Sequence, residues 1–461
     1  MTPPLAISAS TPRGTEPASE RSGEANGSNR LAVEDRAAHR WYRFVLSFPP
    51  HLVRDYLKKL SLGPGDTVLD PFCGTGTTLV ECKKLGISSI GIEANPMAHF
   101  ASMVKTDWRA DGRALARHAR EVASRADEKL SGLGTGAMPS GGLFSHDVPG
   151  HLNLLALPKE SMGLLLGGSI SPLPLHRALV LLDLLKGRDG DGRFFRHELL
   201  ALAKGLVTTI GNLHFGPEVG VGSPKEDAPV VGDWLSNVNE IAEDLGELGS
   251  MKDVPSAVNL FDSRRIHEVV KPDSVDGVIT SPPYPNEKDY TRTTRLESVL
   301  LGFVGDKSQL RAFKRTLIRS NTRNVYKGDD EDKLVADIPE IRRIAEEIES
   351  RRIAMGKTSG FERQYARVAK LYFGGMAKHL AEMRAVLRPG ARLAYVVGDQ
   401  ASYLRVMIRT GQILAKIADG LGYEVGGVDL FRTRLATATR EQLREEVVLL
   451  RWPGEHGHKG R

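Results

Sequence analysis

The residues best suited to chemistry form a short sequence near the middle of the chain: Ser281, Pro282, Pro283 and Tyr284. They follow a β-branched run at 275–280 that is typical of a buried parallel strand. Two prolines cannot continue that strand, because neither has an N–H to donate to the ladder. The chain must leave the sheet with a stiff backbone, which holds a hydroxyl, two carbonyls and an aromatic ring at the edge where open α/β sheets bind ligands. A plain strand-ending turn explains these four residues equally well, so the choice depends on the rest of the chain.

A glycine-rich loop offers a second candidate site. The strand predicted at 67–70 ends in an acid, and residues 71–78 turn through Gly-Thr-Gly into a predicted helix, which presents N–H groups and a positive dipole end to an anion. The Walker A lysine is absent, and Leu79 stands where a dinucleotide-binding motif has its third glycine. An acid before the loop would repel a phosphate but attract an ammonium group. The loop residues expected to contact a ligand are Asp70, Phe72, Gly74, Thr75, Gly76, Thr77 and Thr78.

Two further acids end neighbouring predicted strands. Glu93 lies about 20 residues past the loop, where a ribose-binding acid is expected, and Asp262 could accept a hydrogen bond from an exocyclic amine. The ligand so described carries an ammonium, a carboxylate, a ribose and an adenine but no pyrophosphate, which fits S-adenosylmethionine better than a dinucleotide. Phe48 and Phe261, with Phe72, are candidate apolar walls. Each acid alone could equally be a solvated strand-end residue.

The elements that must position these residues alternate between strand and helix on both flanks of a helical middle. We expect a disordered tail over 1–30, one catalytic domain built from 35–105 and 255–452, a helical insert over 106–253, and a frayed tail over 453–461. After the proline pair, the pattern predicts helices at 290–303, 371–387 and 413–421, with strands at 392–399 and 446–452.

Composition sets further bounds. Two cysteines, Cys73 and Cys82, are too few for a disulfide scaffold or a structural zinc site, so no metal is expected. No apolar run is long enough to cross a bilayer and no signal-peptide core is present, which indicates a cytoplasmic protein without a membrane partner. The net charge of +6 permits a polyanionic partner without requiring one.

Residues 70–78 and 280–284 together closely resemble the amino-methyltransferase family that modifies DNA at cytosine N4 or adenine N6. Residues 39–50 are similar to the family's N-terminal cofactor motif, 289–297 to its usual continuation after Ser-Pro-Pro-Tyr, and 387–399 to its late helix-strand hairpin. The resemblance covers roughly 35–110 and 255–452. It implies a Rossmann-like S-adenosylmethionine-dependent methyltransferase sheet with an inserted, mainly helical subdomain, placed where the family carries a target-recognition region.

The resemblance also implies roles for the site residues. Ser281 Oγ and the Pro282 carbonyl would hold the two hydrogens of an exocyclic amine, and Tyr284 would stack on the flipped base. Asp70 would bind the amino group of S-adenosylmethionine, the N–H groups of 74–78 its carboxylate, Glu93 its ribose and Asp262 its adenine. The serine form is commoner in the cytosine-N4 branch, so cytosine N4 is favoured and adenine N6 remains open. Cys73 lies in the cofactor loop, which argues against a nucleophilic role.

The partner expected from the resemblance is double-stranded DNA. A run of seven basic residues without an acid spans 307–327, and phosphate contacts are expected from Arg311, Lys314, Arg315, Arg319 and Arg323. A restriction endonuclease or other defence protein commonly accompanies such enzymes, although solitary ones exist. Two alternatives remain: an RNA base methyltransferase, which shares similar motifs, and a non-catalytic nucleotide-binding protein.

Overall fold

A computed structural model describes residues 31–43, 47–136, 153–187, 192–215, 218–286, 288–435 and 442–454. The tail expected over 1–30, and all but the first two residues of the one expected over 453–461, lie outside the described residues. No helix among the described residues is both long enough and apolar enough to span a membrane.

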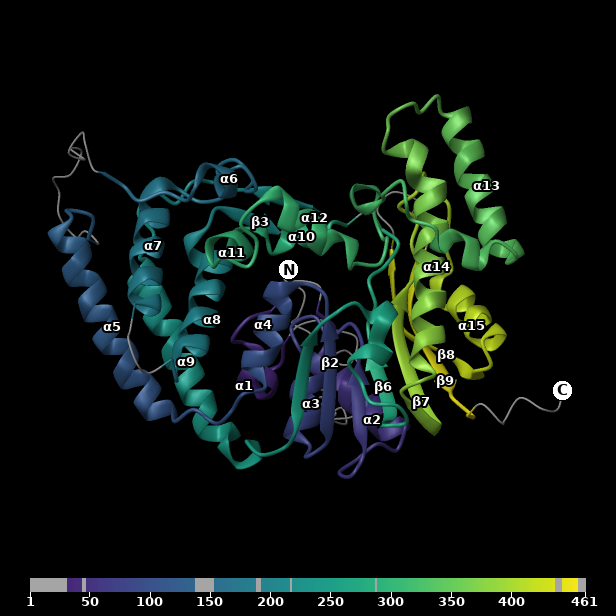
Figure 1. The fold of residues 1–461 in the computed structure, drawn as a ribbon, viewed down its shortest axis with the longest axis horizontal. Helices are drawn as coiled ribbons and strands as arrows, with labels where there is room; N and C mark the ends of the chain where they lie inside the picture. The colour runs from purple at the N-terminus through teal and green to yellow at the C-terminus, as the bar shows by residue number, and fades with distance from the viewer. Residues whose placement is uncertain are drawn as a thin grey trace, which may run out of the picture.

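The described part of the chain is built on a seven-stranded sheet (Figure 1), whose first five strands run parallel. The last strand in the chain lies antiparallel between the two strands that precede it in the sequence. In spatial order the strands are β5 (Ser256–Leu260), β2 (Ser88–Glu93), β1 (Thr67–Asp70), β6 (Val275–Thr280), β7 (Leu387–Gly398), β9 (Gln442–Arg451) and β8 (Glu424–Leu435). The predicted α/β fold with a Rossmann-like sheet is confirmed.

The strand order reverses between β1 and β6. From β1 the chain proceeds outward to β2 and β5, and it then returns to place β6 and β7 on the other side. Val68 pairs with Gly277 and Leu69 with Val278, so the carboxyl ends of β1 and β6 lie next to each other. This is the switch point at which open α/β sheets bind ligands, and it brings the glycine-rich loop beside the Ser-Pro-Pro-Tyr sequence.

Both faces of the sheet are buried by apolar side chains. On one face Val68, Ile279 and Val447 pack with the apolar stripe of α2 (Pro50–Lys59). On the other face Leu69, Val278 and Val448 join the cores of α14 and α15. Neighbouring strand residues thus point to opposite faces, as the period of two requires. The helices around the sheet are α3 (Thr77–Lys84), α4 (Pro96–Lys105), α13 (Pro339–Ala354), α14 (Tyr365–Met383) and α15 (Thr410–Gly420).

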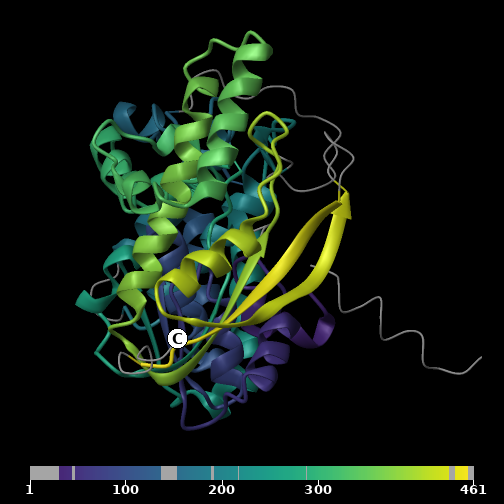
Figure 2. The same cartoon turned by 90° about the vertical axis from the view of Figure 1, so that its right-hand side faces the viewer.

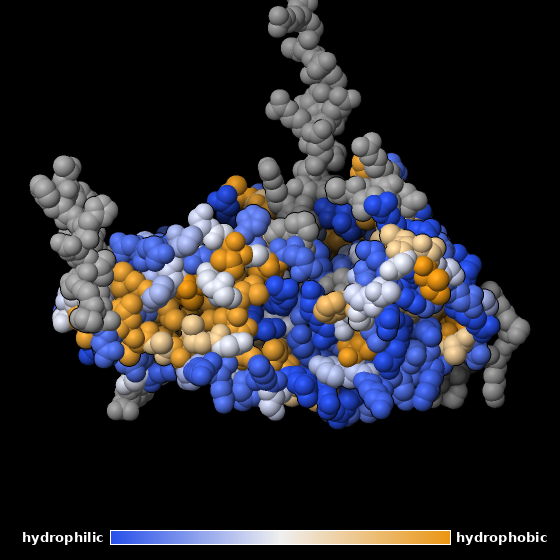
Figure 3. All heavy atoms as spheres, turned by 90° about the horizontal axis from the view of Figure 1, so that it is seen from above, coloured by the Kyte–Doolittle hydropathy of each residue, from blue (hydrophilic) through white to orange (hydrophobic). Residues whose placement is uncertain are grey.

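The insert is mainly helical, as expected, and lies beside the sheet (Figure 1). Its core is continuous with α4, since Phe100 and Ala101 belong to the same cluster as Leu115, Leu200 and Trp234. Hydrophobic residues gather on the upper surface of this half of the molecule, whereas the other half is mostly hydrophilic there (Figure 3). The elements of the insert are α5 (Gly112–Gly132), α6 (Lys159–Met162), α7 (Pro172–Lys186), α8 (Phe195–Gly205), a π-helical turn (Leu206–Ile210), β3 (Leu213–Phe215), β4 (Val219–Val221) and α9 (Val230–Leu248).

Short segments connect these layers. They are α1 (Arg36–His39), α10 (Tyr290–Thr293), α11 (Arg295–Leu300) and α12 (Lys307–Arg315), with 3-10 turns at Val33–Asp35, Gly249–Met251, Ser263–Glu268, Thr322–Asn324, Glu331–Val335 and Glu362–Gln364. The helix predicted at 290–303 is therefore two helices. They are separated at Thr294, which has a non-helical backbone and accepts a hydrogen bond from the Asn95 side chain at 3.1 Å.

Two strand predictions need correction. The helix expected over 371–387 ends at Met383, and β7 already begins at Leu387, so Pro389 and Gly390 lie within a strand. The register of β6 and β7 shifts here and Gly390 has a φ of +91°, as expected where a bulge admits these residues. Strand β8 was not predicted, because it is polar and largely exposed and lacks the alternation of a half-buried strand. Figure 2 shows the β8–β9 hairpin reaching away from the other strands.

Candidate active site

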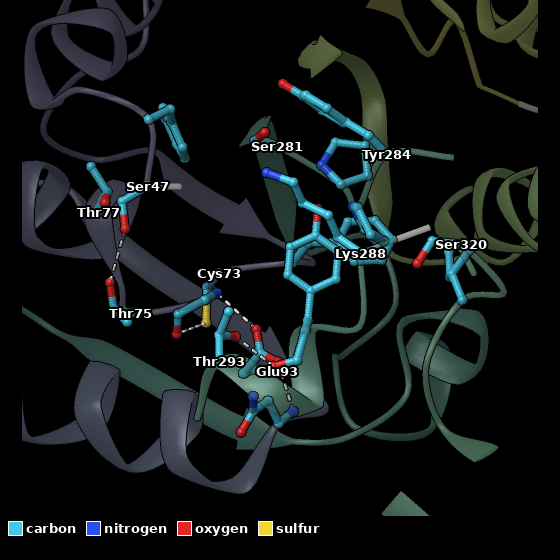
Figure 4. A pocket seen from close by; sticks show the side chains of 18 of the residues that line it. Ser47, Cys73, Thr75, Thr77, Glu93, Ser281, Tyr284, Lys288, Thr293 and Ser320 are labelled. Carbon is cyan, nitrogen blue, oxygen red and sulfur yellow. Dashed lines mark hydrogen bonds between the residues drawn. The ribbon is translucent and has the colours of Figure 1, made fainter. Parts of the chain in front are cut away.

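A cavity of about 370 Å³ lies at the carboxyl ends of the central strands, and the two candidate sites form parts of its wall. In Figure 4, Ser281 and Tyr284 lie across the pocket from Thr75 and Thr77, with Glu93 and Cys73 between them. The predicted residues that line this cavity are Phe48, Phe72, Gly74, Thr75, Thr77, Glu93, Phe261, Ser281, Pro282, Pro283 and Tyr284. Asp70, Gly76, Thr78 and Asp262 do not line it.

The Ser-Pro-Pro-Tyr loop is held firmly against the end of β7. The Tyr284 hydroxyl lies near Ser281, and burial raises the pKa of the phenol, which therefore stays protonated. A Cβ on Gly398 would lie 3.0 Å from Cε2 of Tyr284, so this glycine makes room for the ring. The Tyr290 hydroxyl contacts both the Tyr284 backbone and the Asn286 side chain. These contacts fix the direction in which the loop presents its hydroxyl and carbonyls.

Asp70 is completely buried directly behind the cavity wall. Its Oδ1 accepts hydrogen bonds from Thr280 Oγ1 at 2.6 Å and from Phe72 N at 3.1 Å. Its Oδ2 is buried and has no hydrogen-bond partner among the described residues. Burial raises the pKa of Asp70 to about 6. An acceptor left without a partner beside Pro71 and Phe72, which line the cavity, suits a ligand that brings its own positive donor.

Glu93 lines the cavity from the end of β2. Its two oxygens accept hydrogen bonds from Gly74 N at 2.8 Å and Asn95 N at 2.7 Å, and burial raises the pKa of its carboxyl to about 7. Both oxygens retain lone pairs, so the carboxylate can still receive a pair of ligand hydroxyls.

We expected the N–H groups of residues 74–78 to bind a ligand carboxylate, but two of them already have partners in the protein. Glu93 occupies the N–H of Gly74, and Cys73 O accepts from the N–H of Gly76 at 2.8 Å. Gly76 instead serves the turn: its φ is +83°, and a Cβ there would lie 2.8 Å from Cβ of Ser102. The first turn of α3 has no side-chain cap, which leaves the N–H groups near Thr75 and Thr77 for a ligand carboxylate.

Asp262 does not face the cavity, contrary to the expectation that it binds an adenine. Its carboxylate pairs with the Arg264 guanidinium, with Oδ1 at 3.0 Å from Nε and Oδ2 at 2.7 Å from Nη2, and also caps the following turn. The neighbours Phe261 and Ser263 line the cavity in its place.

The basic run at 307–327 is divided between structural and exposed cations. Arg319 is 4 % exposed, and its Nε and Nη2 each lie 2.9 Å from the Asp329 carboxylate, so the predicted phosphate contact by Arg319 is not supported. Lys314 Nζ pairs with buried Asp289 at 2.9 Å. The side chains left for a solvent-side anion are those of Arg311, Arg315 and Arg323, all of them exposed.

Comparisons with known proteins give a consistent result. A family model described as DNA methylase, of the N6/N4 type, matches residues 17–103. The type II methyltransferase M.BsoBI of Geobacillus stearothermophilus is 25% identical over 450 residues, covering 91% of this chain and 85% of that protein. M.AvaI of Nostoc sp. is 24% identical and covers 92% and 88%. M.MjaII of Methanocaldococcus jannaschii is 47% identical over 58 residues, which are 13% and 11% of the two chains.

These matches confirm the predicted resemblance to the DNA amino-methyltransferase family. A solved rRNA methyltransferase, aviRa from Streptomyces viridochromogenes, matches 94% of both chains at 10% identity, with a TM-score of 0.31. The similarity to these methyltransferases implies S-adenosylmethionine as methyl donor. The residues present fit that molecule: the unpartnered oxygen of Asp70 suits its ammonium, the uncapped turn of α3 its carboxylate, and Glu93 its ribose.

Sequence reasoning missed several residues in and around this cavity. Lys105 is 1 % exposed and donates from Nζ to the Thr75 carbonyl at 2.7 Å, and burial lowers the pKa of its amine to about 7, so it braces the cofactor loop from behind. Arg434 and Glu445 reach the cavity from the unpredicted hairpin, and Lys288 from the loop after Tyr284. Of these, only Lys288 had a usable signal, because it follows the Pro-Pro sequence so closely. Burial also raises the pKa of the Cys73 thiol far above its ordinary value, which disfavours a thiolate nucleophile.

Proposed function

We propose that the protein is a site-specific DNA methyltransferase that methylates the exocyclic N4 of a cytosine flipped into the cavity. The observation that carries this proposal is that one cavity joins Ser281, Pro282 and Tyr284 with Glu93 and the glycine-rich loop. A site for a methyl donor and a site for a planar base therefore share one space. The serine at position 281 favours cytosine N4 over adenine N6.

The donor would be bound by the half of the cavity built on β1, β2 and α3. Asp70 holds the ammonium, Thr75 and Thr77 receive the carboxylate through their N–H groups, and Glu93 accepts both ribose hydroxyls. The apolar walls are Phe48, Phe72 and Phe261. S-adenosylmethionine supplies a methyl group on a sulfonium, which transfers by direct displacement without a covalent enzyme intermediate.

The base would be held by the other half. Its amine is a poor nucleophile because the nitrogen lone pair is delocalised into the ring. Ser281 Oγ and the Pro282 carbonyl accept its two hydrogens, which favours a pyramidal nitrogen with its lone pair aimed at the methyl group. Tyr284 stacks on the ring and offsets part of an unstacking cost of a few kcal/mol. After methyl transfer the nitrogen loses its extra proton to water or to a neighbouring group.

The DNA duplex would lie along the hydrophilic side of the cavity mouth, where Arg311, Arg315 and Arg323 are available for phosphates. The insert 106–253 remains our candidate for target recognition, and its Val207 and Phe215 reach the cavity wall. M.BsoBI and M.AvaI are type II methyltransferases, which supports a role in restriction-modification with a cognate endonuclease or another defence protein as partner.

The test compares purified wild-type, Ser281→Ala and Tyr284→Ala proteins for transfer of labelled methyl groups to duplex DNA. Both variants should keep their affinity for S-adenosylmethionine and lose methyl transfer by about 100-fold or more, because misplacing the amine by about 1 Å has that effect. Ser274→Ala, at the opposite end of β6, is the matched control and should remain active.

Nucleoside mass spectrometry of the product DNA identifies the base. N4-methylcytosine is expected, and N6-methyladenine would move the proposal to the other branch of the family. Full turnover in both Ser281→Ala and Tyr284→Ala, or methylation of RNA alone, would contradict the proposal.

A further inference from the structure

Lys288 places a positive charge in the cavity, and no ion pair among the described residues neutralises it. Its side chain is half-buried, lines the cavity and extends toward Ser281 (Figure 4). Within the described residues, no hydrogen bond or ion pair engages its Nζ. The nearby cations differ in this respect, since Lys314 pairs with Asp289 and Arg432 with Glu445 at 2.7 Å.

The backbone that carries Lys288 is fixed on both sides. Its N–H donates to the Asn286 side chain at 3.2 Å, and its carbonyl accepts from Asn321 Nδ2 at 3.0 Å. Asn321 is fully buried. These two contacts orient the backbone so that the Lys288 side chain extends toward the cavity, where its ammonium can meet a molecule that enters.

The charges around Lys288 make a further partner necessary once water is displaced. Burial, and then the Arg434 cation on β8, lower the pKa of the Lys288 amine, while Glu218 acts in the opposite sense. A base entering the cavity would remove water from an ammonium that has no acceptor among the described residues, and this is unfavourable unless the base supplies an acceptor itself.

We propose that Lys288 recognises the flipped base by donating a hydrogen bond from Nζ to the ring acceptor next to the amine-bearing carbon. This inference rests on the function proposed above. In cytosine the amine carbon C4 is bonded to N3, which is an acceptor. Ser281 holds an amine hydrogen, so an ammonium directed at Ser281 approaches the neighbouring N3. Thymine has an N–H donor at that position and would face the ammonium with its hydrogen. Lys288 thus acts as a specificity-determining residue beside Ser281.

The test combines a protein variant with an altered base. Once the target site has been mapped from methylated DNA, duplexes carry either cytosine or 3-deazacytosine, in which N3 is replaced by C–H, at the target. Single-turnover methyl transfer and S-adenosylmethionine affinity are measured for wild type and Lys288→Met. Lys271→Met, an exposed lysine at the opposite end of β6, is the matched control.

We expect Lys288→Met to reduce the transfer rate on cytosine by roughly 10- to 100-fold, the range for a lost hydrogen bond to a charged group, with unchanged cofactor affinity. Wild type should lose a similar factor on 3-deazacytosine, and Lys288→Met should show little further loss on that base. If the product proves to be N6-methyladenine, 1-deazaadenine replaces 3-deazacytosine with the same expectation.

Four results would overturn the inference. Unchanged rates in Lys288→Met would remove any role for the side chain. An equal loss on both bases would place the ammonium on a phosphate, and an equal loss joined to a shifted pH profile would make it a proton acceptor. A wild-type protein that methylates no DNA amine would overturn the proposed function as well. This outcome is seen in the wild-type measurement alone, so it is separate from any effect of the Lys288→Met substitution.

Discussion

Two buried carboxyls lie near the glycine-rich loop, Glu93 in the cavity wall and Asp70 directly behind it. Asp70 and Glu93 both lie at strand ends, and burial raises both of their pKa values. They differ in the contacts that they already have: both Glu93 oxygens accept backbone hydrogen bonds, whereas Asp70 has one oxygen without a partner. Asp70 is thus the group whose environment changes most when a cationic ligand binds.

Asp70→Asn should make the free protein more stable at neutral pH. The folded-state pKa of Asp70, about 6, lies above its ordinary value of 3.8, so the folded protein loses stability as pH rises through this interval. Above pH 6 the variant should be more stable by up to about 3 kcal/mol, and below pH 4 it should match wild type. Urea unfolding at pH 4, 5, 6 and 7.5 measures this difference.

Cofactor binding provides the second half of that experiment. In wild type the dissociation constant of S-adenosylmethionine should fall as pH rises from 5 to 7, because the bound ammonium requires ionised Asp70. In Asp70→Asn the affinity for S-adenosylmethionine should be at least 10-fold weaker, and the dissociation constant should be nearly independent of pH across this range. Equal affinities of the two proteins at pH 7.5 would remove Asp70 from the cofactor site.

For single residues, the sequence predicts which side chains lie at the ligand edge of the sheet better than it predicts their hydrogen-bond and ion-pair partners. Ser281, Tyr284 and Glu93 were predicted because a strand end places each of them at the ligand edge of the sheet, and all three line the cavity. Asp262 obeys the same rule, yet Arg264 two residues later binds its carboxylate. A strand-end pattern specifies where a side chain begins, and local partners decide where its oxygens point.

At the scale of elements, the segment from α12 to the following loop combines two functions in one basic run. Every third or fourth residue is basic, and this spacing alone does not show which of the basic side chains are exposed and which are buried. The fold separates them, because Asp289 and Asp329 neutralise Lys314 and Arg319, while other arginines stay on the surface. Strand β8 is a second element that the sequence does not reveal. Its residues are mostly polar, so the pattern does not predict a strand, yet the strand borders the cavity.

Replacing Arg311, Arg315 and Arg323 together with glutamine should weaken DNA binding similarly for all sequences. Each lost phosphate contact should reduce the slope of log affinity against log salt concentration by about 1. Filter binding or fluorescence anisotropy at several salt concentrations measures both quantities. An unchanged slope would show that the DNA backbone passes elsewhere.

Arg319→Gln serves as the contrasting variant in the same segment. Its removal leaves the Asp329 carboxylate, 8 % exposed, without its partner, and loss of one member of a buried pair costs about 3–5 kcal/mol. The salt slope of the protein that remains folded should match wild type, which separates a structural arginine from a DNA-contacting one.

On the scale of the whole molecule, the insert and the cofactor site are joined through the N-terminal segment. Asp244 on α9 accepts hydrogen bonds from Ala38 N at 3.1 Å, Trp41 Nε1 at 2.7 Å and Arg40 Nη2 at 2.6 Å. The next residue, Tyr42, lines the cavity and contacts buried Glu297. The insert therefore helps to hold the segment that lines the cavity, and one hydrophobic core runs from the insert into that segment.

Asp244→Ala should lower both stability and cofactor affinity. The variant leaves several buried hydrogen-bond donors without an acceptor, and we expect a loss of about 3 kcal/mol in the free energy of unfolding. Glu243→Ala is the matched control, since Glu243 is 72% exposed and contacts Arg40 only at 3.4 Å, so its effect should stay below about 1 kcal/mol. Chemical denaturation and calorimetric titration of cofactor give the two readouts. A destabilised variant with wild-type cofactor affinity would show that the insert does not support the site.

The hydrogen bond between Thr280 and Asp70 also has a consequence for how the protein is made. The two residues are 210 positions apart, and β1 pairs with β6 only after the whole insert has emerged from the ribosome. At about 5–20 residues per second, roughly 10–40 seconds of translation separate the two strands. For that time the nascent chain carries a central strand with an open edge, which is the kind of surface that chaperones bind and that aggregates when they are scarce.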